Sequence, residues 1–78
     1  MTNLEKYNEV FIRSFGVSEH ELEELAYQSI EAWDSVGQVE LVVELEKAFD
    51  VEMNPEDIID FSSYKKGIEL LKKYDIVM

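Results

Sequence analysis

Cysteine is absent from this 78-residue sequence, which excludes disulfides and zinc sites with thiolate ligands as a means of stabilising the chain. Histidine is nearly absent too, because His20 is the only one. A single histidine cannot complete a transition-metal site, and it offers no evident base to a catalytic serine. Residues 50–57 also lack the alternating ligands and central glycine of an EF-hand loop. We therefore expect neither a metal site nor enzymatic activity, and we interpret His20 as a solvated surface residue.

Long apolar runs are missing as well. No stretch approaches the roughly 18 consecutive apolar residues that a transmembrane helix needs. The first residues do not combine basic side chains with an apolar run, as a secretory signal would. We expect a cytoplasmic protein without membrane insertion.

Basic residues are scarce: seven Lys and Arg stand against 18 Asp and Glu, which gives a net charge of −11. This charge repels the phosphates of nucleic acids and anionic lipid surfaces, so charged partners should be basic. Hydrophobic residues still make up 46 % of the chain, too many for a disordered acidic tail. Because a chain this short holds one small core, we expect a single domain spanning residues 1–78, and we also expect a monomer.

Helix breakers are few, with one proline and three glycines. The first helix is predicted at residues 3–14, where Thr2 and Glu5 form a capping box and apolar residues recur at helical spacing. Gly16 is predicted to stop this helix at its C-terminal end.

A long connection follows the first helix. Ser18 and Glu21 form a second capping box, which predicts that the acidic segment after Ser18 is partly helical. Residues 27–33 are interpreted as an ordered loop.

The second major helix is predicted to begin at Ser35 or Val36 and to end at about Phe49. Ser35 could be a plain N-cap, with its oxygen accepting from the backbone of Gln38 while the Gln38 side chain reaches back in a capping box.

Two shorter elements complete the pattern. Asn54 as N-cap and Pro55 at the first helical position predict a short acidic helix to about Asp60. Ser62 or Ser63 then caps a last helix.

That last helix is predicted at residues 64–74, with Ile68 and Leu71 buried. No strand alternation competes with these helices. The predicted fold class is all-α: a small four-helix bundle with a long first loop and a short third helix.

The helix at 35–49 has two apolar sides. An arc of about 120° should face the core and consists of Leu41, Val42, Leu45, Ala48 and Phe49. The opposite side carries Val36, Val39 and Val43. Charged residues edge this valine strip, namely Glu40, Glu46, Lys47 and Asp50. The composition is typical of a transient docking surface for basic partners, although the long loop or the short third helix could instead bury the valines.

With these residues in view, most of the chain resembles the acyl carrier protein family. The resemblance rests on Asp34-Ser35-Val36 opening the helix, on the run 39–42, and on the short acidic helix that precedes the final one. Within the helix it also covers Leu45, Glu46 and Phe49. Trp33 fits the aromatic residue that many stand-alone carriers have before the Asp-Ser pair.

Two positions depart from the family's pattern. Val36 stands where the family more often has leucine or methionine, and Lys47 interrupts the acidic edge typical of fatty-acid carriers. The second departure points towards a specialised pathway with its own partner enzymes.

The resemblance implies a bundle of acyl-carrier type in which a phosphopantetheinyl transferase attaches 4′-phosphopantetheine from coenzyme A to Ser35. The thiol of this cofactor would hold acyl intermediates as thioesters and supply the sulfur that the chain lacks. Asp34 would be an adjacent recognition residue. Acyl-loading and acyl-processing enzymes with basic docking patches would contact Val36, Val39, Glu40, Val43 and Glu46.

Several alternatives stay open. The cargo could be fatty-acyl, polyketide, aminoacyl or peptidyl, and a non-carrier acidic interaction module would also explain the charge. Four residues could form a wall that shelters a short acyl chain, or could be ordinary core: Leu45, Phe49, Ile59 and Ile68.

Overall fold

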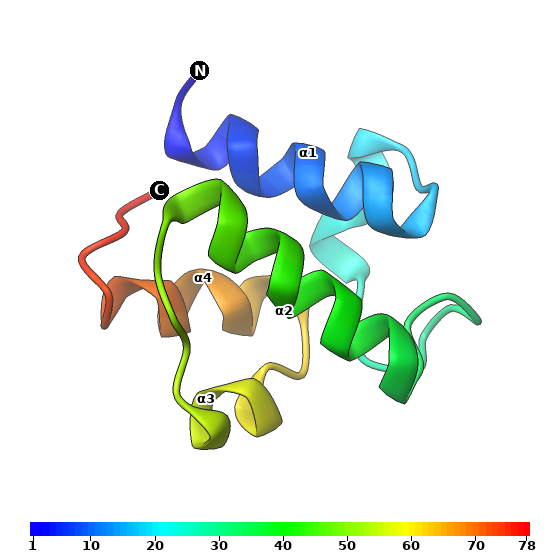
Figure 1. Ribbon diagram of the computed structural model, residues 1–78. Coiled ribbons are helices and arrows are strands. Elements are labelled where there is room, and N and C mark those ends of the chain that lie inside the picture. Colours follow the sequence, from blue (N-terminus) through cyan, green and yellow to red (C-terminus); the bar gives the residue numbers. More distant parts are fainter.

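The computed structural model describes residues 1–78 and confirms the all-α class (Figure 1). Its elements are α1 (Asn3–Phe15), the 3₁₀ helix η1 (Glu19–Glu24), α2 (Ser35–Phe49), α3 (Pro55–Asp60) and α4 (Tyr64–Lys72). α1 packs against α2, and α4 lies behind α2 in the view of Figure 1. No helix combines the length and apolarity that crossing a bilayer requires.

The capping boxes predicted near the N-terminus are both present. The Glu5 amide donates to Thr2 Oγ1 at 3.1 Å, and Glu5 Oε1 accepts from the Thr2 amide at 2.9 Å. A second box joins Ser18 and Glu21 at the start of η1. α1 ends at Gly16 in the left-handed conformation. These local patterns fix where the first two helical segments begin because each satisfies backbone amides that a helix leaves unpaired.

The loop between η1 and α2 is ordered by backbone hydrogen bonds. The Gln28 amide donates to Trp33 O at 2.8 Å, which closes the loop on itself. An isolated bridge pairs Ala26 with Ser63 and fastens this loop to the junction between α3 and α4. The prediction of an ordered loop at residues 27–33 is confirmed.

Phe11 is the centre of an aromatic core. Its ring lies 4.9–6.2 Å, centroid to centroid, from five other rings: Tyr7, Phe15, Trp33, Phe61 and Tyr64. These rings come from α1, the long loop, the segment after α3, and α4. Aromatic rings bury large areas and favour tilted or offset contacts, so this cluster supplies much of the cohesion that a chain without disulfides needs. From the predicted core face of α2, Leu41, Val42 and Leu45 are buried in the core, whereas Ala48 and Phe49 are half-buried against it.

The buried side of α4 differs in part from the predicted one: Leu71 is buried as predicted, but Ile68 is not. Ile68 is only half-buried, whereas Gly67, Leu70 and Leu71 face the core. The helix also ends at Lys72, two residues earlier than predicted: the amides of residues 73–75 each donate three residues back in a tighter turn, and Asp75 then takes the left-handed conformation. Gly67 accounts for this difference, since the missing side chain lets Tyr7 and Phe61 lie directly against the helix at this position.

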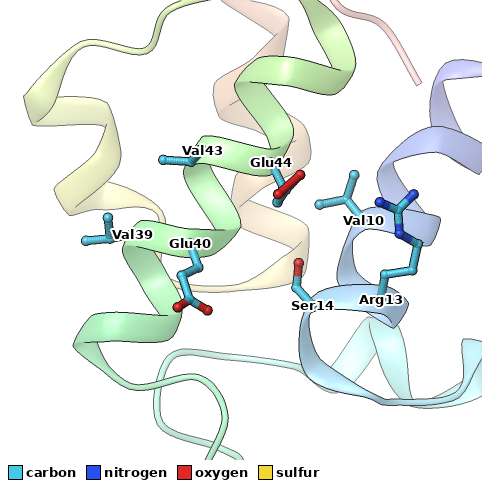
Figure 2. A pocket seen from close by; sticks show the side chains of 7 residues that line it. All are labelled: Val10, Arg13, Ser14, Val39, Glu40, Val43 and Glu44. Atoms are coloured by element: carbon cyan, nitrogen blue, oxygen red, sulfur yellow. The ribbon is translucent and has the colours of Figure 1, made fainter.

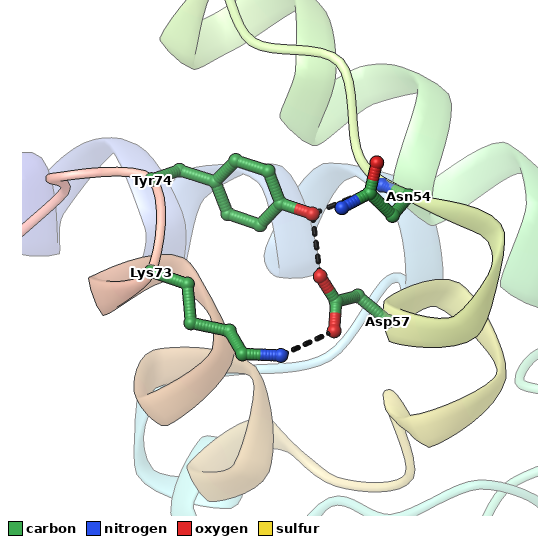
Figure 3. Close-up of polar contacts among 4 residues, drawn as sticks. All are labelled: Asn54, Asp57, Lys73 and Tyr74. Atoms are coloured by element: carbon green, nitrogen blue, oxygen red, sulfur yellow. Dashed lines mark hydrogen bonds and ion pairs between the residues drawn. The ribbon is translucent and has the colours of Figure 1, made fainter.

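A polar cluster fastens α3 to the end of α4 (Figure 3). Asp57, only 2 % exposed, accepts from Lys73 Nζ at 2.6 Å and from the Tyr74 hydroxyl at 2.5 Å. The Tyr74 oxygen in turn accepts from the Asn54 amide at 2.9 Å. The hydrogen bonds from Lys73 and Tyr74 lower the pKa of Asp57, and the bond to Asp57 raises the pKa of Lys73. We call these four residues the Asp57 cluster.

Replacing Gly67 with alanine should destabilise the protein, although alanine is the better helix former by about 1 kcal/mol. A Cβ at position 67 would lie 2.2 Å from both Phe61 Cζ and the Tyr7 oxygen, and both of those side chains are buried. We expect the free energy of unfolding in urea to fall by about 1–3 kcal/mol. Lys66→Ala, at the exposed position before it, should change that free energy little. An equal or greater stability of Gly67→Ala would show that the contact is not tight.

The Asp57 cluster predicts a particular response to acid. A carboxyl whose pKa is lower in the folded than in the unfolded chain binds fewer protons when folded, so its stabilisation is present above the unfolded pKa and is lost as the pH falls. We expect Asp57→Asn to lower the melting temperature at neutral pH by several degrees. The same variant should flatten the loss of stability between about pH 5 and pH 2.

Asp60→Asn is the matched control, because it removes the same charge from an exposed position of α3. Its pH dependence should follow that of the unsubstituted protein. Parallel pH profiles for Asp57→Asn and Asp60→Asn would contradict the role given to the cluster.

Candidate functional site

Ser35 is the first residue of α2 and is exposed. The predicted role of Ser35 as N-cap is wrong, because Asp34 occupies that position: its Oδ1 accepts from the Gly37 amide at 2.8 Å. Asp34 has the extended backbone of an N-cap residue, and its carbonyl accepts from the Gln38 amide at 2.8 Å. Ser35 Oγ therefore takes no part in capping and belongs to an exposed side chain.

The start of α2 is suited to an anion attached at Ser35. Asp34 pairs the amide of Gly37, while the amides of Ser35 and Val36 make no hydrogen bond within the protein. Unpaired amides and the positive end of the helix dipole favour a phosphate at this position. A phosphodiester on Ser35 Oγ would thus fit the residues that are present.

Gln38 has a different role from the predicted one. Its side chain does not reach back to the helix start; instead Oε1 accepts from Trp33 Nε1 at 2.5 Å. Nε2 donates to Ile58 O and Phe61 O, each at 2.9 Å. The amide therefore joins α2 to the buried tryptophan of the loop and to the C-terminal end of α3. The one sequence signal for this contact is Trp33 itself, since a buried indole N–H needs an acceptor.

Gly37 allows the preceding loop to approach the helix closely. A Cβ at this buried position would lie 2.0 Å from the carbonyl oxygen of Ala32. Glycine is a poor helix former, but at this position it lets the Ala32 carbonyl lie against the first turn of α2, beside Ser35.

A shallow groove of about 320 Å³ adjoins Ser35. It lies between the long loop, α2 and α3 and is lined by Tyr27, Ser35, Gln38, Ile58, Ile59, Phe61 and Ser62. We call it the Ser35 groove. Of the four residues considered as a wall for an acyl chain, Ile59 alone lines it, and Ile59 is 82 % exposed. Leu45 is fully buried in the core, whereas Phe49 and Ile68 are half-buried against it.

A second groove, of about 440 Å³, lies between α1 and α2 (Figure 2). It is lined by Val10, Arg13, Ser14, Val39, Glu40, Val43 and Glu44. The valine strip is exposed, at 64 % for Val36, 59 % for Val39 and 40 % for Val43. The alternative in which the loop or α3 buries these valines is therefore wrong.

The two acidic residues predicted to contact partners differ in exposure and in hydrogen bonding. Glu40 is exposed, and Figure 2 shows its carboxylate directed away from the helix. Glu46 is half-buried, and its Oε2 accepts from the Met53 amide at 2.8 Å, so it supports the loop before α3.

His20 lies exposed on η1, with Nε2 3.3 Å from Ser18 Oγ. No group of three potential metal-ligating side chains occurs in the structure.

Comparison with known proteins identifies the family. The model of a family described as phosphopantetheine attachment site matches residues 33–71, which is half of the chain and spans α2, α3 and nearly all of α4. No curated protein matched the sequence, and no solved structure did. Carrier domains of this family hold 4′-phosphopantetheine covalently, are not catalysts themselves, and interact with phosphopantetheinyl transferases and partner enzymes. The chain belongs to the phosphopantetheine attachment-site family and is a carrier protein whose cofactor is covalently bound 4′-phosphopantetheine.

Proposed function

We propose that Ser35 Oγ is the attachment point of 4′-phosphopantetheine, and that the thiol of the cofactor carries acyl intermediates as thioesters between the enzymes of a biosynthetic pathway. The observation that carries this proposal is the exposed Ser35 hydroxyl, which takes no part in capping because Asp34 is the N-cap of α2. Within the matched span, Ser63 Oγ instead caps α4 by accepting from the Lys66 amide at 3.0 Å. Ser62 is exposed, but it lies in the segment between α3 and α4 rather than at a helix start.

The attachment reaction needs little from the carrier. A phosphoester bond forms between Ser35 Oγ and the phosphorus next to the pantetheine arm, while the pyrophosphate bond of coenzyme A breaks and adenosine bisphosphate leaves. The transferase, with its magnesium ion, takes the serine proton and stabilises the leaving group. The carrier supplies an accessible hydroxyl, two unpaired amides near the phosphate, and Asp34 beside the site as a recognition residue. On this proposal the chain is not an enzyme, and it acts in the cytoplasm.

The docking surface follows from the exposed side of α2. We assign it to Val36, Val39, Glu40, Val43 and Glu46. Three exposed valines give a partner apolar contact area, and Glu40 attracts basic groups on the approaching enzyme. Glu46 contributes charge at the far end of the strip while it holds the Met53 amide.

The negative net charge of the chain complements basic patches on the transferase and on the pathway enzymes. The charge of −11 speeds the encounter with such partners and disfavours nucleic acids. An acidic module that acts by charge alone would not need apolar residues interleaved with its carboxylates. The cargo belongs to a fatty-acyl, polyketide or other specialised pathway, with an aminoacyl or peptidyl cargo as the alternative.

Modification at Ser35 predicts a specific mass change. The unmodified protein, incubated with coenzyme A, magnesium and a broad-specificity phosphopantetheinyl transferase, should gain the mass of one phosphopantetheinyl group. Ser35→Ala should gain none. Ser62→Ala is the matched control, because this serine lines the same groove, and it should be modified completely. An adduct on Ser35→Ala, or none on the unsubstituted protein, would refute the proposal.

Reversing the charge at Glu40 should weaken docking. We expect Glu40→Lys to lower kcat/KM of the transferase for this carrier about fivefold at low salt, with a smaller effect at high salt. Glu69→Lys makes the same charge change at an exposed position of α4 and should have little effect. Equal effects of the two substitutions would mean that net charge, rather than the α2 surface, governs recognition.

The apolar part of the same surface is tested by Val39→Glu. Because Val39 is 59 % exposed, this variant should keep the melting temperature of the unsubstituted protein. Its modification by the transferase should be slower. Unfolding of Val39→Glu would show that the valine belongs to the core.

A further inference from the structure

We propose that Gln38 determines which cargo this carrier accepts: its side-chain amide seals the seam between α2 and α3, so that the acyl group stays outside in the Ser35 groove. The carrier would then suit short or polar acyl groups rather than long alkyl chains. This inference rests on the proposed attachment at Ser35 and deepens it by naming the class of cargo.

Gln38 makes three hydrogen bonds across the seam. Both Nε2 protons are donated, to Ile58 O and Phe61 O, and Oε1 accepts the Trp33 indole proton. An alkyl chain that entered the bundle from Ser35 would have to displace this amide. It would leave Phe61 O and the Trp33 indole N–H without the partners they have, and Ile58 O would keep only the Phe61 amide, which is unfavourable for groups that are partly buried.

Aromatic side chains fill the space behind the amide. Trp33 is fully buried and Phe61 is 1 % exposed, and their ring centroids are 6.4 Å apart. Both rings also contact Phe11 at the centre of the core. Because close-packed interiors resist the opening of new volume, a chain that passed Gln38 would have to separate these rings.

The third helix is held at both ends. Gln38 binds carbonyls at its C-terminal end, while Asp57 in its first turn is fixed to Lys73 and Tyr74 of the segment that ends α4 (Figure 3). An outward swing of α3, which would widen the seam, would have to break one of these two attachments.

The Ser35 groove has the size and lining for a small group. Its volume of about 320 Å³ is at the low end of the range for ligand pockets, which is roughly 300–1,000 Å³. Tyr27, Ile58 and Ile59 offer apolar contact, and Ser62 offers a hydroxyl. The arm begins at Ser35 Oγ, which itself lines the groove, so an arm that folds back can place its thiol end there; we take the occupant to be that end with a short acyl group.

The unsubstituted protein, loaded with acetyl- or octanoyl-phosphopantetheine, provides the first test. In amide and indole NMR spectra, the two forms should differ only near the groove, at Tyr27, Ile59 and Ser62. Hydroxylamine should cleave both thioesters at rates that agree within about twofold, because neither is sheltered. Shifts of the Leu45 and Leu71 amides and of the Trp33 indole in the octanoyl form would overturn the proposal.

Substitution of Gln38 provides the second test. Gln38→Ala removes the seal, so the octanoyl thioester should become about fivefold slower to cleave than the acetyl thioester, through partial entry into the bundle. Lys47→Ala, at an exposed position of the same helix, should behave like the unsubstituted protein. Where Gln38→Ala does not fold, Gln38→Met replaces it, since methionine keeps the volume but none of the three hydrogen bonds. Equal cleavage rates in a folded Gln38 variant would overturn the role of Gln38.

Failure of this inference is distinguishable from failure of the proposed function. A protein that gains no phosphopantetheinyl mass refutes the attachment at Ser35. A protein that is loaded at Ser35 but shows core shifts with octanoyl refutes only the sealing of the seam.

Discussion

The hydrogen bonds of one side-chain amide determine how the functional end of this protein is arranged. Gln38 takes the indole proton of Trp33 and gives its own protons to two carbonyls at the end of α3. The loop, the second helix and the third helix are therefore held to one another within one turn of Ser35. The aromatic core explains why this arrangement persists, because Trp33 and Phe61, the residues that Gln38 binds, are also members of the ring cluster around Phe11.

Most of the helical pattern was predictable because its signals are local. Capping boxes at Thr2 and Ser18 act over three residues. The Asn54-Pro55 pair marks the start of α3 through backbone preference alone, because the Asn54 side chain makes no capping hydrogen bond. The start of α2 was harder, since Asp34 and Ser35 are both good capping residues. Close approach of the Ala32 carbonyl at Gly37 accompanies the extended backbone of Asp34, and local sequence does not reveal such a contact.

Long-range polar contacts could not be predicted from the sequence. Gln38 binds backbone carbonyls 20 and 23 residues away, and a carbonyl has no signature among the side-chain types. Asp57 lies within the short acidic helix that the sequence predicts, but its pairing with Lys73 depends on how α3 and α4 meet. The buried side of α4 was misplaced for a related reason: hydrophobicity favours Ile68, whereas the space beside Tyr7 and Phe61 admits only Gly67.

The position of Gln38 also links the two sides of α2. Successive residues of a helix point about 100° apart, so Gln38 faces α3 while Val39 faces the groove between α1 and α2. Fixing Gln38 to α3 therefore fixes the rotation of α2 about its own axis. That rotation, which the core packing of Leu41, Val42 and Leu45 also fixes, keeps the valine strip exposed. The amide of Gln38 thus helps to set the surface that α2 presents to partners, while Asp34, by capping the helix, leaves the Ser35 hydroxyl free to carry an arm.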